Sequence, residues 1–311
     1  MRRFGLLLLL VGIAFSLERQ FAPRAFAFDP RADEILKAAR TAIGGEQLLQ
    51  KIQALHVKGQ YRRILGEREL SGDRELSILL PDKYLAEDEI NPGGLSTAMI
   101  STRGLNGEHS WSGTSGGEGG HMIIRMGAPG GPQVTPEQME AIFRRQYQAE
   151  FTRYLLAILA MPPPSLAVEY KYAGESEVEN TPAEVIDVTG PDHFAVRLFI
   201  DKQTHIPLLL SYRGNKPRIM TAFKTSMDKA AKTDDAVKQA RETAEKKLAT
   251  EPAPKPEEVE FFVRLTEYKN VEGLSLPHKL TFLTENEVSE EFQISQYQLN
   301  PQFKPDKFQK H

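Results

Sequence analysis

The chain has 311 residues, a formal net charge of −3, an apolar fraction of 40% and no cysteine. The lack of cysteine excludes disulfide bonds and thiolate metal sites, and the mildly acidic balance argues against a nucleic-acid partner. A chain of this length without crosslinks must be stabilised by its apolar core, which can serve one large β-rich domain or two small ones.

The first 27 residues have the pattern of a secretory signal peptide. Two arginines follow the initial methionine, an apolar run extends from Phe4 to Leu17, and Ala25 and Ala27 are the small residues that a signal peptidase reads. We predict cleavage after Ala27. Residues 1–27 hold four arginines and one glutamate, so residues 28–311 carry a net charge of −6. The apolar run is shorter than the roughly 20 residues that span a bilayer. An uncleaved anchor is the alternative, and a bacterial periplasm is the predicted location.

Helix signals begin directly after this leader. Asp29 and Pro30 form a cap residue followed by proline in the first turn. Apolar residues at helical spacing continue to Ile43, where a pair of glycines ends the pattern. Residues 46–52 indicate a short second helix.

A series of strands follows, separated by turns rich in glycine, asparagine and proline. The predicted strands cover residues 56–65, 74–80, 84–90, 98–102 and 109–112. The predicted turns cover residues 65–67, 71–73, 91–94 and 106–107. The glycine-rich stretch 113–132 is predicted to be a loop at the mouth of the sheet.

The strongest helix signal comes next. Thr135 to Gln138 form a capping box with proline at the first helical position. Apolar residues at helical spacing make one broad stripe that extends to Leu159, and prolines follow from Pro162. The stripe predicts a helix over residues 136–160 that packs on an apolar surface.

Strands resume at residues 166–173 and continue to Leu299. A pattern of a strand, a polar turn and a strand entered through an apolar-proline step occurs twice, over residues 185–212 and 261–282. Between the two copies, residues 224–256 hold few large apolar residues among many charged ones and then several prolines. This composition predicts a solvated helix or a partly disordered surface insertion.

The strand faces carry more apolar residues than a sheet with one wet side needs. Val196, Leu198 and Ile200 line one face, but Phe199 lies on the other. The surplus predicts that helices cover part of the sheet. Two interpretations stay open. The helices and the sheet form a packed core, which the residues slightly favour, or the concave side is left partly empty as an apolar cavity for an acyl chain.

The residues do not form a catalytic or metal-binding constellation. None of the seven histidines pairs with another at metal-ligand spacing, and residues 113–116 do not match the nucleophile elbow. The carboxylates of residues 87–89 are interpreted as a solvated rim, with a cation site as the alternative. The prediction is a protein that is not an enzyme and holds no metal and no cofactor.

Four segments resemble units of one known family. Residues 79–84 form a strand that breaks at a proline before an aromatic residue, and residues 102–111 place Asn-Gly before an aromatic strand. Residues 199–207 contain the end of a strand, an aspartate, a turn and a proline that begins the next strand. Residues 299–308 resemble the segment that ends the chain in that family. In this order they are similar to the LolA-like group, the outer-membrane lipoprotein carriers of the bacterial periplasm and their relatives. Leu80 departs from the pattern, because the carriers have a basic residue before this proline.

The resemblance implies an α+β fold class: an open, strongly curved antiparallel half-barrel with helices covering the concave face. It implies a single domain over residues 28–311 that binds a lipid or the acyl chains of a lipoprotein without chemistry, as a monomer. The departure at Leu80 and the charged insertion motivate a second hypothesis. In it, the same fold is an envelope protein-interaction or stress-sensing module with a protein partner.

The spacing of apolar residues along the strands and the long helix shows which of them share a face, and this suggests the wall of an apolar pocket. The candidates are Leu76, Ile78, Met99, Trp111, Leu155, Leu198, Ile200 and Phe282. Trp111, the only tryptophan, is expected either in the core or at the cavity, because large aromatic residues in strands usually pack.

Overall fold

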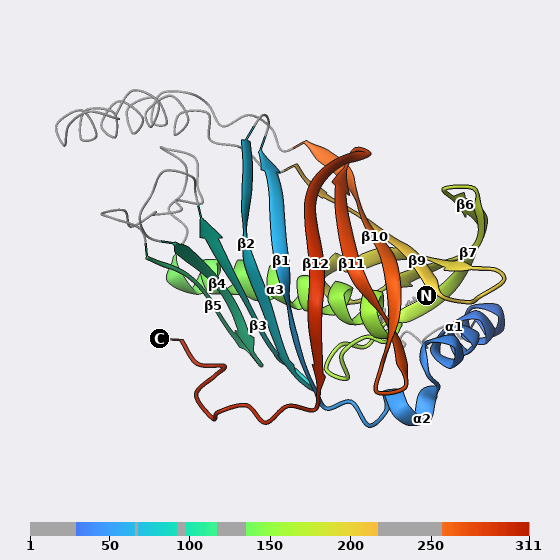
Figure 1. The fold of residues 1–311 in the computed structure, drawn as a ribbon, viewed down its shortest axis with the longest axis horizontal. Helices are drawn as coiled ribbons and strands as arrows, with labels where there is room; N and C mark the ends of the chain where they lie inside the picture. Colours follow the sequence, from blue (N-terminus) through green and yellow to red (C-terminus); the bar gives the residue numbers. More distant parts are fainter. Residues whose placement is uncertain (1–28, 66–67, 92–97, 117–134, 217–256, 311) are drawn as a thin grey trace, which may run out of the picture.

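The structure is a computed structural model that describes residues 29–65, 68–91, 98–116, 135–216 and 257–310. The predicted leader, most of the glycine-rich stretch and the charged insertion lie outside these residues. The described residues form one antiparallel sheet of twelve strands in the order β5-β4-β3-β2-β1-β12-β11-β10-β9-β8-β7-β6 (Figure 1).

The strands are long and well matched to their neighbours. β1 is Ala54–Leu65, β2 Arg68–Leu79, β3 Lys83–Asn91, β4 Met99–Asn106 and β5 His109–Gly116. β6 is Glu169–Val178, β7 Thr181–Thr189, β8 Ala195–Asp201, β9 Pro207–Asn215, β10 Glu258–Val271, β11 Leu274–Thr284 and β12 Glu287–Leu299. β1 to β5 form one meander, β6 to β12 form a second, and the β1–β12 pair joins them.

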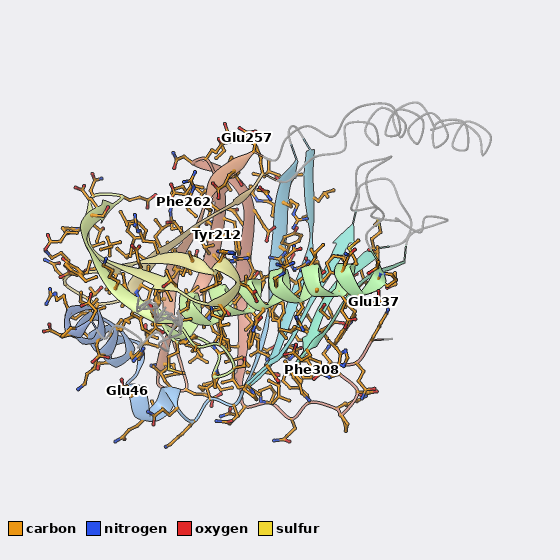
Figure 2. The ribbon with its side chains drawn as sticks, turned by 180° about the vertical axis from the view of Figure 1, so that it is seen from behind. Glu46, Glu137, Tyr212, Glu257, Phe262 and Phe308 are labelled. Carbon is orange, nitrogen blue, oxygen red and sulfur yellow. The ribbon has the colours of Figure 1, made fainter. Side chains whose placement is uncertain are left out.

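This topology explains the position of the long helix α3, Pro136–Leu159. The chain leaves the first meander at the edge strand β5 and enters the second at the opposite edge strand β6. A helix of 24 residues is about 36 Å long, which suits a crossing from edge to edge. Figures 1 and 2 show α3 lying across one face of the curved sheet. We call this the concave face.

The N-terminal helix α1, Pro30–Ile43, lies at the β6 end of the sheet, where it packs on β6 and β11. The Asp29 carboxylate accepts hydrogen bonds from the backbone N–H groups of Arg31 and Ala32, which caps α1. It also accepts one from the backbone N–H of Tyr172 at 2.8 Å, which ties the helix start to β6. These backbone hydrogen bonds lower the pKa of Asp29. The short helix α2 is Glu46–Leu49.

The main core lies between the concave face and the helices. Its buried residues come from both meanders, from Ile35 and Leu36 of α1, and from Phe151 and Leu155 of α3. The predicted α+β class, with an open curved antiparallel sheet and helices on its concave face, is confirmed. Helices α1 and α3 are confirmed within a residue of their predicted ends.

Several predicted details differ from the structure. Residues 113–116 of the predicted loop belong to β5, and the second helix ends at Leu49 rather than at residue 52. The predicted turn at residues 71–73 lies inside β2, because Ser71 and Gly72 pair with strands on both sides, β1 and β3. Neighbouring strands here satisfy backbone groups that a turn would otherwise satisfy locally. The first copy of the repeated pattern holds three strands, β7 to β9, since the short 3-10 helix Pro191–His193 separates β7 from β8. β6 begins at Glu169 rather than at residue 166.

Candidate functional site

Five of the eight predicted pocket residues belong to the main core between the sheet and the helices. They are Leu76, Ile78, Leu155, Leu198 and Ile200, all buried. Phe282 of β11 is partly buried and packs against the same cluster. Met99 of β4 is half-buried and, by the alternation of the strand, shares the face of Arg103.

Trp111 is separated from these residues. It packs in a second cluster with Leu85 and Phe308, on the opposite face of the sheet. The indole lies over Gly104 of β4, where an added Cβ would come within 2.2 Å of the ring. Ser110 and Ser112, its neighbours in β5, have the opposite orientation and face α3. Trp111 therefore belongs to the packing of the C-terminal segment on the outer face.

Two clefts among the described residues lie apart from the five core residues. The larger, about 250 Å³, lies on the outer side and is lined in part by Leu79, Lys83, Phe303 and Phe308. The smaller, about 120 Å³, lies beside α3 and the segment that precedes β8. The helices and the sheet are packed against each other, as the first of the two sequence interpretations expects.

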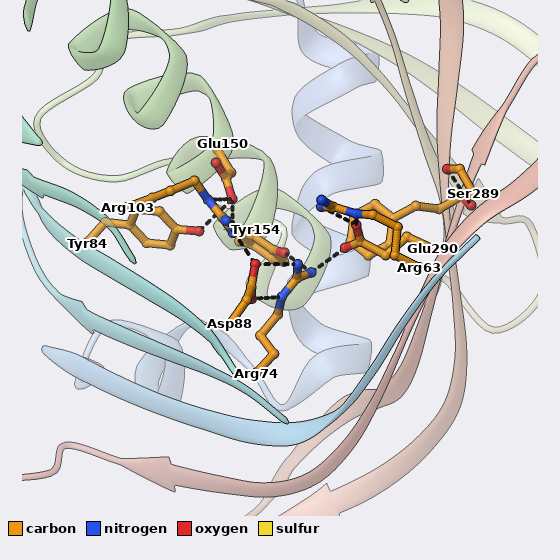
Figure 3. Close-up of polar contacts among 10 residues, drawn as sticks. Arg63, Arg74, Tyr84, Asp88, Arg103, Glu150, Tyr154, Ser289 and Glu290 are labelled. Atoms are coloured by element: carbon orange, nitrogen blue, oxygen red, sulfur yellow. Dashed lines mark hydrogen bonds and ion pairs between the residues drawn. The ribbon is translucent and has the colours of Figure 1, made fainter. Parts of the chain in front are cut away.

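A network of charged and phenolic side chains lies between α3 and the concave face (Figure 3). We call it the buried ion network. Its members are Arg63 of β1, Arg74 of β2, Tyr84 and Asp88 of β3, Arg103 of β4, Glu150 and Tyr154 of α3, and Glu290 of β12. The side chains of Arg74 and Asp88 are each only 2% exposed. Buried charges of this kind require partners.

Arg74 is the centre of the network. Its Nε and Nη2 donate to the two carboxylate oxygens of Asp88 at 2.5 and 3.0 Å. Its Nη1 donates to Glu290 and, at 3.3 Å, to the hydroxyl of Tyr154. The guanidinium carbon also lies 4.1 Å from the ring centroid of Tyr61. Strands β3 and β12 therefore supply both carboxylate partners of Arg74, and α3 adds only the Tyr154 hydroxyl.

Arg103 depends on the helix. Its Nη1 donates to Asp88 at 2.8 Å, and its Nε donates to Glu150 of α3 at 3.3 Å. The hydroxyl of Tyr84 donates to the same Glu150 oxygen at 2.9 Å. A separate contact joins Arg63 to Glu290 at 3.0 Å. Three arginines thus face three carboxylates.

The network shifts the pKa values of its members. Burial would raise the pKa of Asp88, but Arg74 and Arg103 outweigh burial and hold this pKa well below its usual range. Glu290 is similar: burial would raise its pKa, and Arg74 and Arg63 lower it overall. Burial raises the pKa of Tyr84. Its phenol therefore stays protonated at neutral pH and donates to Glu150.

We expect stability to fall in acid because of these carboxylates. A carboxylate with a depressed folded-state pKa contributes stability above its unfolded pKa, near 4, and this contribution is lost as the pH falls through the folded-state pKa. Below pH ~4, the free energy of unfolding of Asp88→Asn should therefore depend less steeply on pH than that of the unmodified protein, by up to about 1.4 kcal/mol per pH unit. Urea denaturation at several pH values measures both slopes, and equal slopes would contradict the assignment.

The sequence interpretation missed this network, although it left a signal. Residues 87–89 were interpreted as a solvated rim, which is wrong for Asp88, whose side chain is buried. Strand alternation directs Asp88 to the concave face, whereas Glu87 lies on the other face and pairs with Lys307. The signal was the spacing of Arg74, which precedes Leu76 and Ile78 in steps of two. This alternation places a charged side chain on the same strand face as the apolar ones.

Within the described ranges, no group of three or more His, Cys, Asp and Glu residues is arranged to hold a metal ion. In that same part of the chain, no helix combines the length and the apolar character that crossing a membrane requires.

The chain has matches among solved structures only: no family model and no curated protein matches it. A LolA superfamily protein from Nitrosomonas europaea matches at 11% identity and a TM-score of 0.41, over 90% of this chain and 97% of that one. A DUF1329 family protein from Desulfovibrio piger matches at 10% identity and a TM-score of 0.43, over 90% and 98%. A protein domain named for outer membrane lipoprotein sorting, from Vibrio parahaemolyticus, matches at 9% identity and a TM-score of 0.44, over 89% and 97%. These matches include the group that the sequence resembles.

Proposed function

We propose that this protein binds and carries a hydrophobic ligand in the cell envelope, and that α3 is the lid of its binding site. The ligand class is a lipid or the acyl chains of a lipoprotein. The leader would export the chain to the periplasm, where residues 28–311 would act as one domain and as a monomer. The function is binding and transfer, not catalysis.

The observation that carries the proposal is the way in which α3 is held on the sheet. The helix buries apolar residues on the concave face, yet it also closes over a network of charges. Replacing buried ion pairs by well-packed apolar residues is often neutral or stabilising, so stability alone does not explain the network. In this network, Arg74, Asp88, Arg63 and Glu290 stay paired with one another on the sheet if the helix leaves. Such an arrangement suits a face that is uncovered and covered again.

The apolar surface beneath the helix has the chemistry that an acyl chain needs. Val57, Leu76 and Ala86 lie side by side on β1, β2 and β3 and are fully buried. Uncovering them without a ligand would be unfavourable, because apolar area would meet water. A ligand that buries the same area would offset this and shift the population toward the open form.

A reversible tether on α3 tests the proposal. Ser110 of β5 donates from its hydroxyl to the backbone oxygen of Glu140 in α3 at 2.8 Å, so the two elements approach closely here. The chain has no cysteine of its own, so Ser110→Cys combined with Glu140→Cys would give a unique pair. Oxidation is expected to weaken binding of a dansyl-labelled fatty acid at least about tenfold, since the lid can no longer lift. Reduction of the same sample should restore binding.

The control is the Ser110→Cys single variant, whose binding should not respond to oxidant. Equal binding by the oxidised and reduced double variant would show that α3 is not the lid. If the unmodified protein took up neither this probe nor phospholipid, and instead captured one envelope protein in stable amounts, the interaction-module hypothesis would replace the carrier.

A further inference from the structure

We propose that the ligand carries an anionic head group, and that this group takes the place of the Glu150 carboxylate on Arg103 and Tyr84 when α3 lifts. The inference rests on the proposed lid function of α3. It adds the chemical class of the ligand and the residues that recognise its polar end.

The division of charge between helix and sheet is the first support. The sheet contributes Arg63, Arg74 and Arg103 to the network but only two carboxylates, Asp88 and Glu290. The third carboxylate, Glu150, belongs to α3. When a ligand chain covers the concave face in place of α3, one positive charge there therefore lacks a carboxylate, and a charge buried under that chain requires a partner.

The location of that charge is the second support. Arg74 loses the Tyr154 hydroxyl of α3 but keeps its hydrogen bonds to Asp88 and Glu290, which are on the sheet. Arg103 keeps one hydrogen bond, to Asp88, and loses Glu150. Tyr84 loses the same acceptor, and its side chain is fully buried. The unsatisfied donors are therefore those of Arg103 and Tyr84.

The geometry of these donors is the third support. The Nε of Arg103 and the hydroxyl of Tyr84 converge on one oxygen atom, at 3.3 and 2.9 Å (Figure 3). Both residues belong to the sheet, on adjacent strands, and Asp88 fixes the guanidinium at 2.8 Å. The lifting of α3 would leave this pair in place. A carboxylate or phosphate oxygen is the natural acceptor for such a guanidinium and phenol pair.

The surroundings fit an amphiphile with this head. Arg103 lies opposite Ala86, which lies opposite Leu76, which lies opposite Val57, in one row across β4, β3, β2 and β1. Neighbouring strands are about 4.8 Å apart. A chain attached to an anion at Arg103 would thus extend directly over the buried apolar surface of the sheet.

A matched pair of probes tests this recognition. Oleate and oleyl alcohol share a hydrocarbon chain and differ in the head, and phosphatidylglycerol and diacylglycerol with identical acyl chains form a second pair. The unmodified protein at mildly alkaline pH is expected to bind the anionic member at least about tenfold more tightly, as a hydrogen bond to a charged group would give. A preference in the first pair alone would identify a carboxylate head, and in the second pair alone a phosphate head.

Arg103→Leu should abolish the preference for the anionic member while the neutral member binds at least as well as before. Tyr84→Phe removes only the hydroxyl and should lower the preference a few-fold, which keeps the test valid if Arg103→Leu does not fold. The control is Arg197→Leu, which removes an arginine that pairs with Asp187 away from the network. It should leave the preference unchanged.

Two results would overturn the inference and leave the proposed lid function standing. One is equal binding of the charged and neutral members by the unmodified protein. The other is a loss of affinity in Arg103→Leu that is the same for both members. Failure of every probe to bind would instead remove the proposed function, and this inference with it.

Discussion

Replacing Arg74 by leucine is expected to lower the free energy of unfolding by about 3–5 kcal/mol, because it breaks a buried ion pair from one side. Asp88 would keep Arg103, but its bidentate contact would be lost, and Glu290 would keep only Arg63. Both carboxylates are well buried, so water cannot replace the missing arginine. Urea denaturation at neutral pH measures the change.

The matched control for this prediction is Arg197→Leu. Arg197 pairs with Asp187 at 2.7 Å, but its side chain is 48% exposed. An exposed pair contributes about 1 kcal/mol or less. Equal losses in the two variants would mean that the burial of Arg74 has no energetic consequence, which would contradict the described network. A change in the denaturant slope would indicate an altered compactness, and the comparison would then rest on the midpoints.

Replacing Gly59 by alanine is expected to cost about 3 kcal/mol, the upper end of the range for overpacking. An added Cβ would lie 2.1 Å from the backbone oxygen of Gln293 and 2.8 Å from its carbonyl carbon. Gly59 stands at the register shift between β1 and β12, the pair that joins the two meanders. The obstacle is the backbone of a central strand, so it cannot rotate away as a side chain can.

Gly113→Ala in the edge strand β5 is the control for this substitution, since an added Cβ there meets nothing within 4 Å. Its stability should change by no more than about 1 kcal/mol. Thermal or urea denaturation of both variants measures the difference. If Gly59→Ala proved as stable as Gly113→Ala, the close approach of β1 to β12 at the bulge would be wrong.

Much of the secondary structure was predictable from the sequence because its signals are local. Asp29 and Pro30 define the start of α1, and the Thr135–Gln138 capping box defines the start of α3; both caps are formed as expected. The error at residues 71–73 has a clear cause. Serine, glycine and aspartate favour turns on their own, but two paired neighbouring strands override that preference in β2.

The candidate site was only partly predictable. Face counting grouped Leu76, Ile78 and Leu155, and all three are buried in one core cluster, because strand and helix periods report which residues of an element share a face. Their part in a binding site stays a prediction. It could not tell which side of the sheet is concave, and so Trp111 was grouped with residues from which the sheet separates it.

The sequence by itself determined the alternation of the strands, the caps and lengths of the helices, and the apolar stripe of α3, since each depends on residues a few positions apart. Only the tertiary structure decided that α3 crosses the concave face and that a charge network lies beneath it. Arg74 meets Asp88 across 14 positions, Tyr154 across 80 and Glu290 across 216. Such meetings depend on strand order and register, which are set by the burial of the whole sheet rather than by any local preference.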